Sequence, residues 1–114
     1  MAAYNRVQKV ASAIQMRLSE LLLHEVKDPR LTWVTITSVV LSRDLSNARV
    51  YYVLTGDAKG AVADVEKALI KATPFLKKRV GEEMSLRVVP SLRFIYDDTF
   101  DKASRIDQLL KDVD

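Results

Sequence analysis

Lysines gather around one short step near the middle of the chain, where residues 71–74 read Lys-Ala-Thr-Pro. Ammonium groups in such a cluster suit phosphate oxygens, and phosphate contacts position a protein on folded nucleic acid without reading its sequence. Further cationic residues occur in the first predicted helix and in the short polar loop at 43–47. The alternative is that these side chains only keep the surface soluble. The candidate contacts are Lys67, Lys71, Ala72, Thr73, Pro74, Lys77, Lys78, Arg6, Lys9 and Arg43.

The Thr-Pro step predicts a break between two helices. Apolar residues at helical spacing predict a helix over 61–72, and Pro74 cannot continue it but suits the first turn of a new one. We therefore expect Thr73 as the N-cap of a helix whose Phe75, Leu76 and Val80 face the core and which stops at Gly81. Lysines at that N-terminus oppose the helix dipole, so an anion bound there would meet helix N–H groups and lysines together.

Catalytic residues are scarce in the sequence. Asp97-Asp98 is a possible carboxylate pair, but adjacent residues in a turn usually diverge or cap a helix. The single histidine, His24, stands near a predicted helix end, where a surface or capping role is commoner than catalysis. No nucleophile–base set or metal-ligand cluster is recognisable, and cysteine is absent. We expect a non-enzymatic protein without a metal or cofactor.

Composition and charge favour a cytoplasmic protein with a polyanionic partner. The 114 residues suit one domain, the longest aliphatic run is only residues 21–23, and no signal peptide is recognisable. The net charge of +3 is uneven: the segment from Ile95 onward carries −3 and the body before it carries +6. We expect one domain over residues 1–114, of which about 97–114 form an acidic helical extension.

The order of the predicted elements indicates an α+β fold. An amphipathic helix over 4–25 precedes strands over 34–42, with a bulge near Ser38, and 48–54, which should form an antiparallel hairpin. Two helices follow, then a strand region over 86–96 in which Pro90 predicts an edge, a bulge or a break. Helix–strand–strand–helix–helix–strand is the order of a type II KH domain, and a short helix closes the chain. The position of its GxxG loop, which clamps single strands, is here taken by residues 71–74.

Three stretches resemble the ribosome-binding factor A family. The first helix opens with NRV at 5–7 and is followed by EVKDPRL at 25–31. The hairpin reads VVLSRDLSNARVY at 39–51, and the last strand region reads LRVVPSLRF at 86–94, followed by Asp97 and Arg105-Ile106. These stretches occur in the family's order and cover nearly the whole chain.

The resemblance implies a type II KH-like fold whose interhelical step is an Ala-x-Gly kink. That step corresponds to Ala72-Thr73-Pro74, so proline replaces the glycine. The resemblance further implies a monomer that binds the free 30S subunit and its 16S rRNA. It would support late 30S assembly, 16S rRNA 5′-end processing and growth in the cold, with a ribosome-assembly GTPase for release. The alternative from the residues is a KH-like protein-interaction module without direct RNA function.

Overall fold

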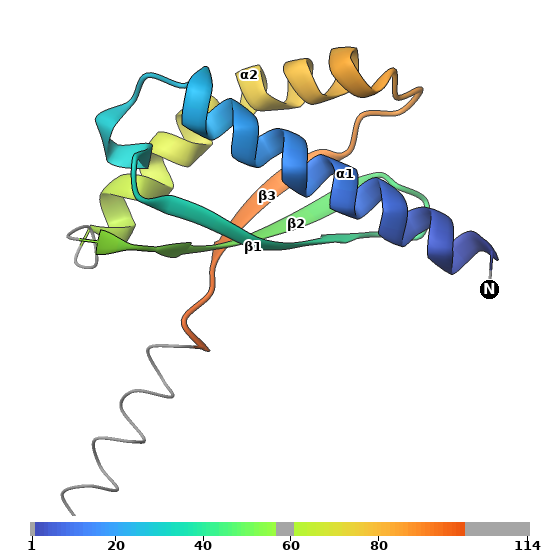
Figure 1. The fold of residues 1–114 in the computed structure, drawn as a ribbon, viewed down its shortest axis with the longest axis horizontal. Helices are drawn as coiled ribbons and strands as arrows, with labels where there is room; N and C mark the ends of the chain where they lie inside the picture. Colours follow the sequence, from blue (N-terminus) through green and yellow to red (C-terminus); the bar gives the residue numbers. More distant parts are fainter. Residues whose placement is uncertain (1, 57–60, 100–114) are drawn as a thin grey trace, which may run out of the picture.

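The computed structural model describes residues 2–56 and 61–99 and has an α+β fold, as predicted. Figure 1 shows two long helices on the same side of a sheet. The elements are α1 (Ala2–His24), the 3-10 helix η1 (Pro29–Leu31), β1 (Val34–Leu41), β2 (Asn47–Leu54), α2 (Val62–Met84) and β3 (Ser91–Tyr96). The chain thus crosses from β2 to β3 through α2.

The sheet has three strands in the order β1-β2-β3, so β2 lies in the centre. β1 and β2 form the predicted antiparallel hairpin, and their register shifts between Ile36 and Ser38, which confirms the predicted bulge. β3 pairs with β2 in parallel, because α2 returns the chain to the same end of the sheet. β3 begins directly after Pro90, which has no backbone N–H to donate to a β-ladder. The predicted break at Pro90 is therefore confirmed.

The core lies between the helices and one face of the sheet. Ile14, Leu18 and their neighbours along α1 are buried, as the apolar periodicity predicts. Every second residue of β2 is also buried, including Val50 and Tyr52, so the opposite face of the sheet carries the alternate residues. No polar or charged residue is buried among those described.

The connection between α1 and β1 is a capped turn. The Asp28 carboxylate accepts a hydrogen bond from the backbone N–H of Arg30 at 3.0 Å and pairs with the Arg30 guanidinium at 2.8 Å. The side-chain hydrogen bond from Arg30 is the main reason why the pKa of Asp28 lies below its ordinary value. The turn places Leu31 in the core.

The helix break predicted at the Thr-Pro step is wrong, because α2 is one continuous helix with Pro74 inside it. Thr73 is not an N-cap: its hydroxyl donates to the carbonyl of Leu69 at 2.7 Å, the bond that a threonine makes within a helix. Proline bends helices, and α2 changes direction along its length in Figure 1. The KH-like class therefore holds, but the two predicted helices are two halves of one.

α2 also continues past Gly81, the predicted stop, to Met84. Ser85 ends the helix with a left-handed backbone (φ 51°), and the N–H of Leu86 donates to the carbonyl of Gly81. A Cβ on Gly81 would lie 2.6 Å from a γ carbon of Val89. The glycine therefore allows the segment before β3 to pack closely on α2, instead of ending the helix.

One prediction falls outside the described residues: the closing helix and most of the acidic extension lie in 100–114. Neither described helix contains a stretch that is both long and apolar enough to span a membrane.

Candidate nucleic-acid interface

Three lysines of α2 share one face of the helix, which we call the α2 lysine face: Lys67, Lys71 and Lys78. Their spacings of four and seven residues place them in one row, with Pro74 between them. All three are exposed. Lys77 is half-buried and about a quarter turn away from Lys78 around the helix, so it does not belong to this row.

The geometry predicted for an anion at this corner is wrong in one respect. Because α2 is continuous, Thr73 and Pro74 lie inside the helix and present no free helix N-terminus. The attraction for phosphate must then come from the lysine ammonium groups. Among the described residues, Lys67 and Lys71 have no carboxylate within ion-pair distance, whereas Lys78 has Glu82 at 4.0 Å.

A groove runs between α2 and the end of α1, beside Lys71. Its volume is about 560 Å³, and Lys27, Lys71, Ala72 and Phe75 line it. Phe75 was predicted to face the core, but it is 40% exposed, with the Arg79 guanidinium 5.6 Å from its ring centre. The prediction failed because neighbouring helix positions point about 100° apart, so with Leu76 and Val80 buried, Phe75 faces the groove instead of the core.

The groove also contains carboxylates, and both are already paired. Glu25 lies 3.6 Å from Arg79, and Asp28 pairs with Arg30. Among the described residues, neither Lys27 nor Lys71 forms an ion pair with these acids, so both ammonium groups are available to an anion in the groove. The groove can accommodate an anionic group larger than a single phosphate.

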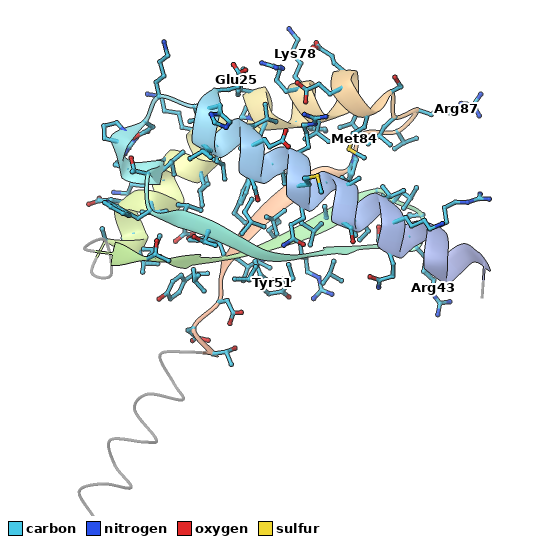
Figure 2. All side chains as sticks on the ribbon, in the orientation of Figure 1. Glu25, Arg43, Tyr51, Lys78, Met84 and Arg87 are labelled. Atoms are coloured by element: carbon cyan, nitrogen blue, oxygen red, sulfur yellow. The ribbon has the colours of Figure 1, made fainter. Side chains whose placement is uncertain are left out.

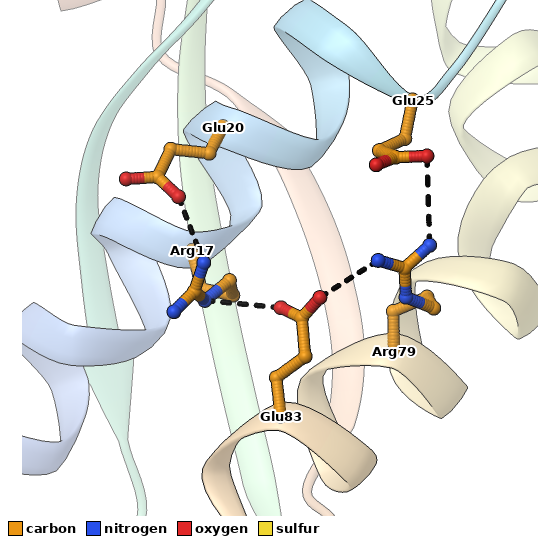
Figure 3. Close-up of polar contacts among 5 residues, drawn as sticks. All are labelled: Arg17, Glu20, Glu25, Arg79 and Glu83. Carbon is orange, nitrogen blue, oxygen red and sulfur yellow. Dashed lines mark hydrogen bonds and ion pairs between the residues drawn. The ribbon is translucent and has the colours of Figure 1, made fainter.

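A network of ion pairs holds α1 against the second half of α2, as Figure 3 shows. Glu83 bridges two arginines, with Arg17 of α1 at 3.0 Å and Arg79 of α2 at 2.7 Å. Arg17 further pairs with Glu20 at 2.8 Å. The hydrogen bond to Glu83 is the main reason why the pKa of Arg79 is raised. The network fixes the part of α2 that carries Lys78.

The remaining candidates lie elsewhere on the molecule. Arg43 belongs to the β1–β2 turn, and Figure 2 shows it well separated from Lys78. Arg6 and Lys9 are exposed near the N-terminal end of α1, the end of the molecule at which Figure 2 shows Arg43. Apart from Lys77, the structure therefore divides the predicted cations into the α2 lysine face and a second group of Arg6, Lys9 and Arg43.

Of the adjacent carboxylates Asp97 and Asp98, Asp97 has the capping geometry that its position in a turn favours. Asp97 accepts a hydrogen bond from the backbone N–H of Thr99 at 3.0 Å, and bonding to Thr99 lowers its pKa. In the part of the chain that the structure describes, no three acidic or histidine side chains converge as a metal site would require.

Comparison with known proteins gives the family. The family model for ribosome-binding factor A matches residues 6–110. Ribosome-binding factor A of Alcanivorax borkumensis is 43% identical over 110 residues, which is 96% of this chain and 80% of that protein. Its relative from Geobacter sulfurreducens is 39% identical over 97% of this chain and 93% of that protein.

A solved structure agrees with the fold and the sequence match. The crystal structure of ribosome-binding factor A from Thermus thermophilus superposes with a TM-score of 0.67 at 26% identity, covering 79% of this chain and 94% of that one. Together with the match along nearly the whole chain, the shared fold shows that this protein belongs to the ribosome-binding factor A family.

Proposed function

We propose that this protein is a ribosome maturation factor that binds the free 30S subunit or its precursor without catalysing a reaction. The observation that carries the proposal is the family match over residues 6–110 together with the exposed α2 lysine face. A further comparison supports it: a Thermus thermophilus ribosome binding factor A fitted into a cryo-EM map of a 30S complex superposes with a TM-score of 0.62 at 28% identity, over 76% of this chain and 90% of that one.

The contacts we propose are ionic and go to phosphates of folded 16S rRNA. Lys67, Lys71 and Lys78 would bind one RNA segment, and Arg6, Lys9 and Arg43 another. Such contacts release counterions and fix the orientation of the protein. Binding that is tighter to one arrangement of the immature RNA than to another shifts the population toward that arrangement, so a binder can promote assembly.

The biological setting follows from the same proposal. We infer a cytoplasmic monomer that acts late in 30S assembly, supports 16S rRNA 5′-end processing and growth in the cold, and leaves the subunit with the help of an assembly GTPase. Cells that lack the protein should accumulate 16S rRNA with an unprocessed 5′ end, most strongly in the cold. Normal processing at low temperature in such cells would contradict this role.

Co-sedimentation with purified ribosomal particles tests the binding proposal. The wild-type protein should pellet with free small subunits at low salt, and not with large subunits. The variant Lys71→Glu/Lys78→Glu should bind at least about tenfold more weakly, because it replaces two phosphate contacts with repulsion. Lys102→Glu/Lys111→Glu, which makes the same change of charge in the acidic segment, should bind like the wild type.

Two other outcomes have distinct meanings. If wild-type protein does not bind small subunits at low salt, the proposed function is wrong. If binding is nearly independent of salt and survives the Lys71→Glu/Lys78→Glu change, the protein-interaction module explains the data better, because apolar contacts are little screened.

A further inference from the structure

The face of the sheet away from the helices carries two arginines side by side. Arg49 of β2 and Arg93 of β3 are partners in the parallel register, and both are exposed. They occupy the alternate positions of strands whose other residues, such as Val50 and Phe94, pack on the core. Tyr51 lies on the same face, on the side of the sheet away from α1 in Figure 2.

This pairing is unfavourable in the free protein. Like charges on neighbouring strands repel each other, and the repulsion destabilises the sheet. Among the described residues, neither arginine has a carboxylate within ion-pair distance. The polar contact that the structure shows for the pair is a hydrogen bond from the Arg49 guanidinium to the Tyr51 hydroxyl oxygen at 3.3 Å. Such a local conflict is typical of a functional site.

A hollow of about 300 Å³ lies between the two arginines and the neighbouring end of the sheet. Besides Arg49 and Arg93, its polar lining comes from Ser42, Asn47 and Ser91, and no acidic residue lines it. The nearby turn contains Asp44, but its carboxylate already accepts hydrogen bonds from the hydroxyls of Ser42 and Ser46 at 2.7 Å. The hollow therefore offers two guanidinium groups and neutral polar groups to an anion.

We propose that Arg49 and Arg93 bind an RNA phosphodiester in this hollow, as a further RNA contact on the opposite side of the molecule from Lys78. A guanidinium presents a planar fork of donors that matches phosphate oxygens, and a phosphate between two forks removes their mutual repulsion. The proposal rests on the proposed function, since it takes RNA to be the partner. It places the protein between two RNA segments, one on α2 and one on the sheet.

The turn between β1 and β2 extends this contact. Arg43 directly follows Ser42, which lines the hollow, and the structure separates Arg43 from the α2 lysine face. Arg43, which the proposed function assigns to an RNA segment with Arg6 and Lys9, therefore suits a neighbouring phosphate of the RNA that binds the hollow. The turn and the sheet would then contact successive phosphates of that one RNA segment.

Binding to purified small subunits across a salt series tests the proposal. Arg49→Gln and Arg93→Gln should each weaken binding about three- to tenfold at ~0.1 M salt, and each should reduce the salt slope by about 0.7 to 0.9. Because the two side chains share one phosphate, the double variant should lose less than the product of the single losses. Arg49→Lys/Arg93→Lys keeps the charge and should recover part of the affinity.

The controls separate this site from the rest of the protein. Arg87→Gln removes one exposed arginine from the segment that follows α2 and should leave binding unchanged. Circular dichroism should show the same fold for every variant. If wild-type protein binds and Lys71→Glu/Lys78→Glu does not, but Arg49→Gln/Arg93→Gln binds like the wild type, the proposal for the sheet is wrong while the proposed function stands. If wild-type protein does not bind small subunits at all, both are wrong.

A cross-link identifies the class of partner. Val40 also lines the hollow and is exposed, and the chain has no cysteine, so Val40→Cys can carry a thiol-linked photo-cross-linker at that position alone. Cross-links to 16S rRNA in the bound subunit would support the proposal. Cross-links to a ribosomal protein without any to RNA would assign the face to a protein contact and overturn it.

Discussion

At the scale of single residues, Gly81 near the C-terminal end of α2 allows the following segment to pack closely on the helix, although the sequence predicts it as a helix stop. Gly81 faces Val89, and a Cβ there would approach the Val89 γ carbon to 2.6 Å. Gly81→Ala should lower the free energy of unfolding in the wild-type background by about 1 kcal/mol, since overpacking outweighs the gain in helix propensity. In a Val89→Ala background the clash disappears, and the same substitution should stabilise. Urea unfolding of the four proteins measures both changes, and the same sign in both backgrounds would contradict the packing role.

The hairpin turn offers a second residue-scale test. Hydrogen bonds from the Ser46 and Ser42 hydroxyls lower the pKa of Asp44 to about 2. Because this pKa is lower in the folded than in the unfolded chain, the contribution to stability is complete above the ordinary pKa of 3.8. It is lost as the pH falls through about 2. Carbon NMR titration of Asp44 should show this low pKa and a clear rise in Ser46→Ala; an unchanged value would refute the role of the hydroxyls.

At the scale of elements, the ion pairs of Glu83 hold α2 on α1. Glu83→Gln should lower the free energy of unfolding by about 1 kcal/mol, because it removes two close charge contacts that are partly shielded from water. The neighbouring Glu82 is 4.0 Å from Lys78 and more exposed, so Glu82→Gln should change stability by under about 0.5 kcal/mol. The difference between the variants should shrink at 1 M salt. Equal effects at low salt would show that the network does not stabilise the helix pair.

The elements also show how far the sequence determines the structure. The buried face of α1, the alternation of β2 and the bulge near Ser38 were all predictable, because periodicity reports burial directly. The continuous helix at the Thr-Pro step was not predictable, since Pro74 suits both the start of a helix and a bend within one. Packing of both halves of α2 on the same core favours the bend.

The candidate site was predictable only in part. Spacing alone places Lys67 and Lys71 on one helix face, but Lys78 joins them only because α2 continues through Pro74. The pairing of Arg49 with Arg93 depends on the parallel register of β2 and β3, which joins strands that are far apart in sequence. Both arginines occupy outward-facing positions of their strands, but this pattern identifies them as a pair only once the order of the strands is known.

At the scale of the whole molecule, the cations fall on different sides of a thin fold. Lys78 lies on the helix side of the sheet and Tyr51 on the other in Figure 2. A protein with cationic groups on two faces can hold two RNA segments in a fixed relation, and each added contact makes binding more dependent on salt. This arrangement suits the proposed role, in which the protein stabilises one conformation of an RNA by binding it more tightly.

The most direct test of this account is the salt dependence of binding to purified small subunits, from about 50 to 300 mM salt. Lys67→Gln/Lys71→Gln, measured beside wild-type protein and Arg87→Gln, should weaken binding and reduce the slope of log affinity against log salt by about 1.5, because two phosphate contacts are lost. Arg87→Gln should keep the wild-type slope. If the double variant keeps that slope as well, the α2 lysine face does not contact RNA and the central claim is wrong.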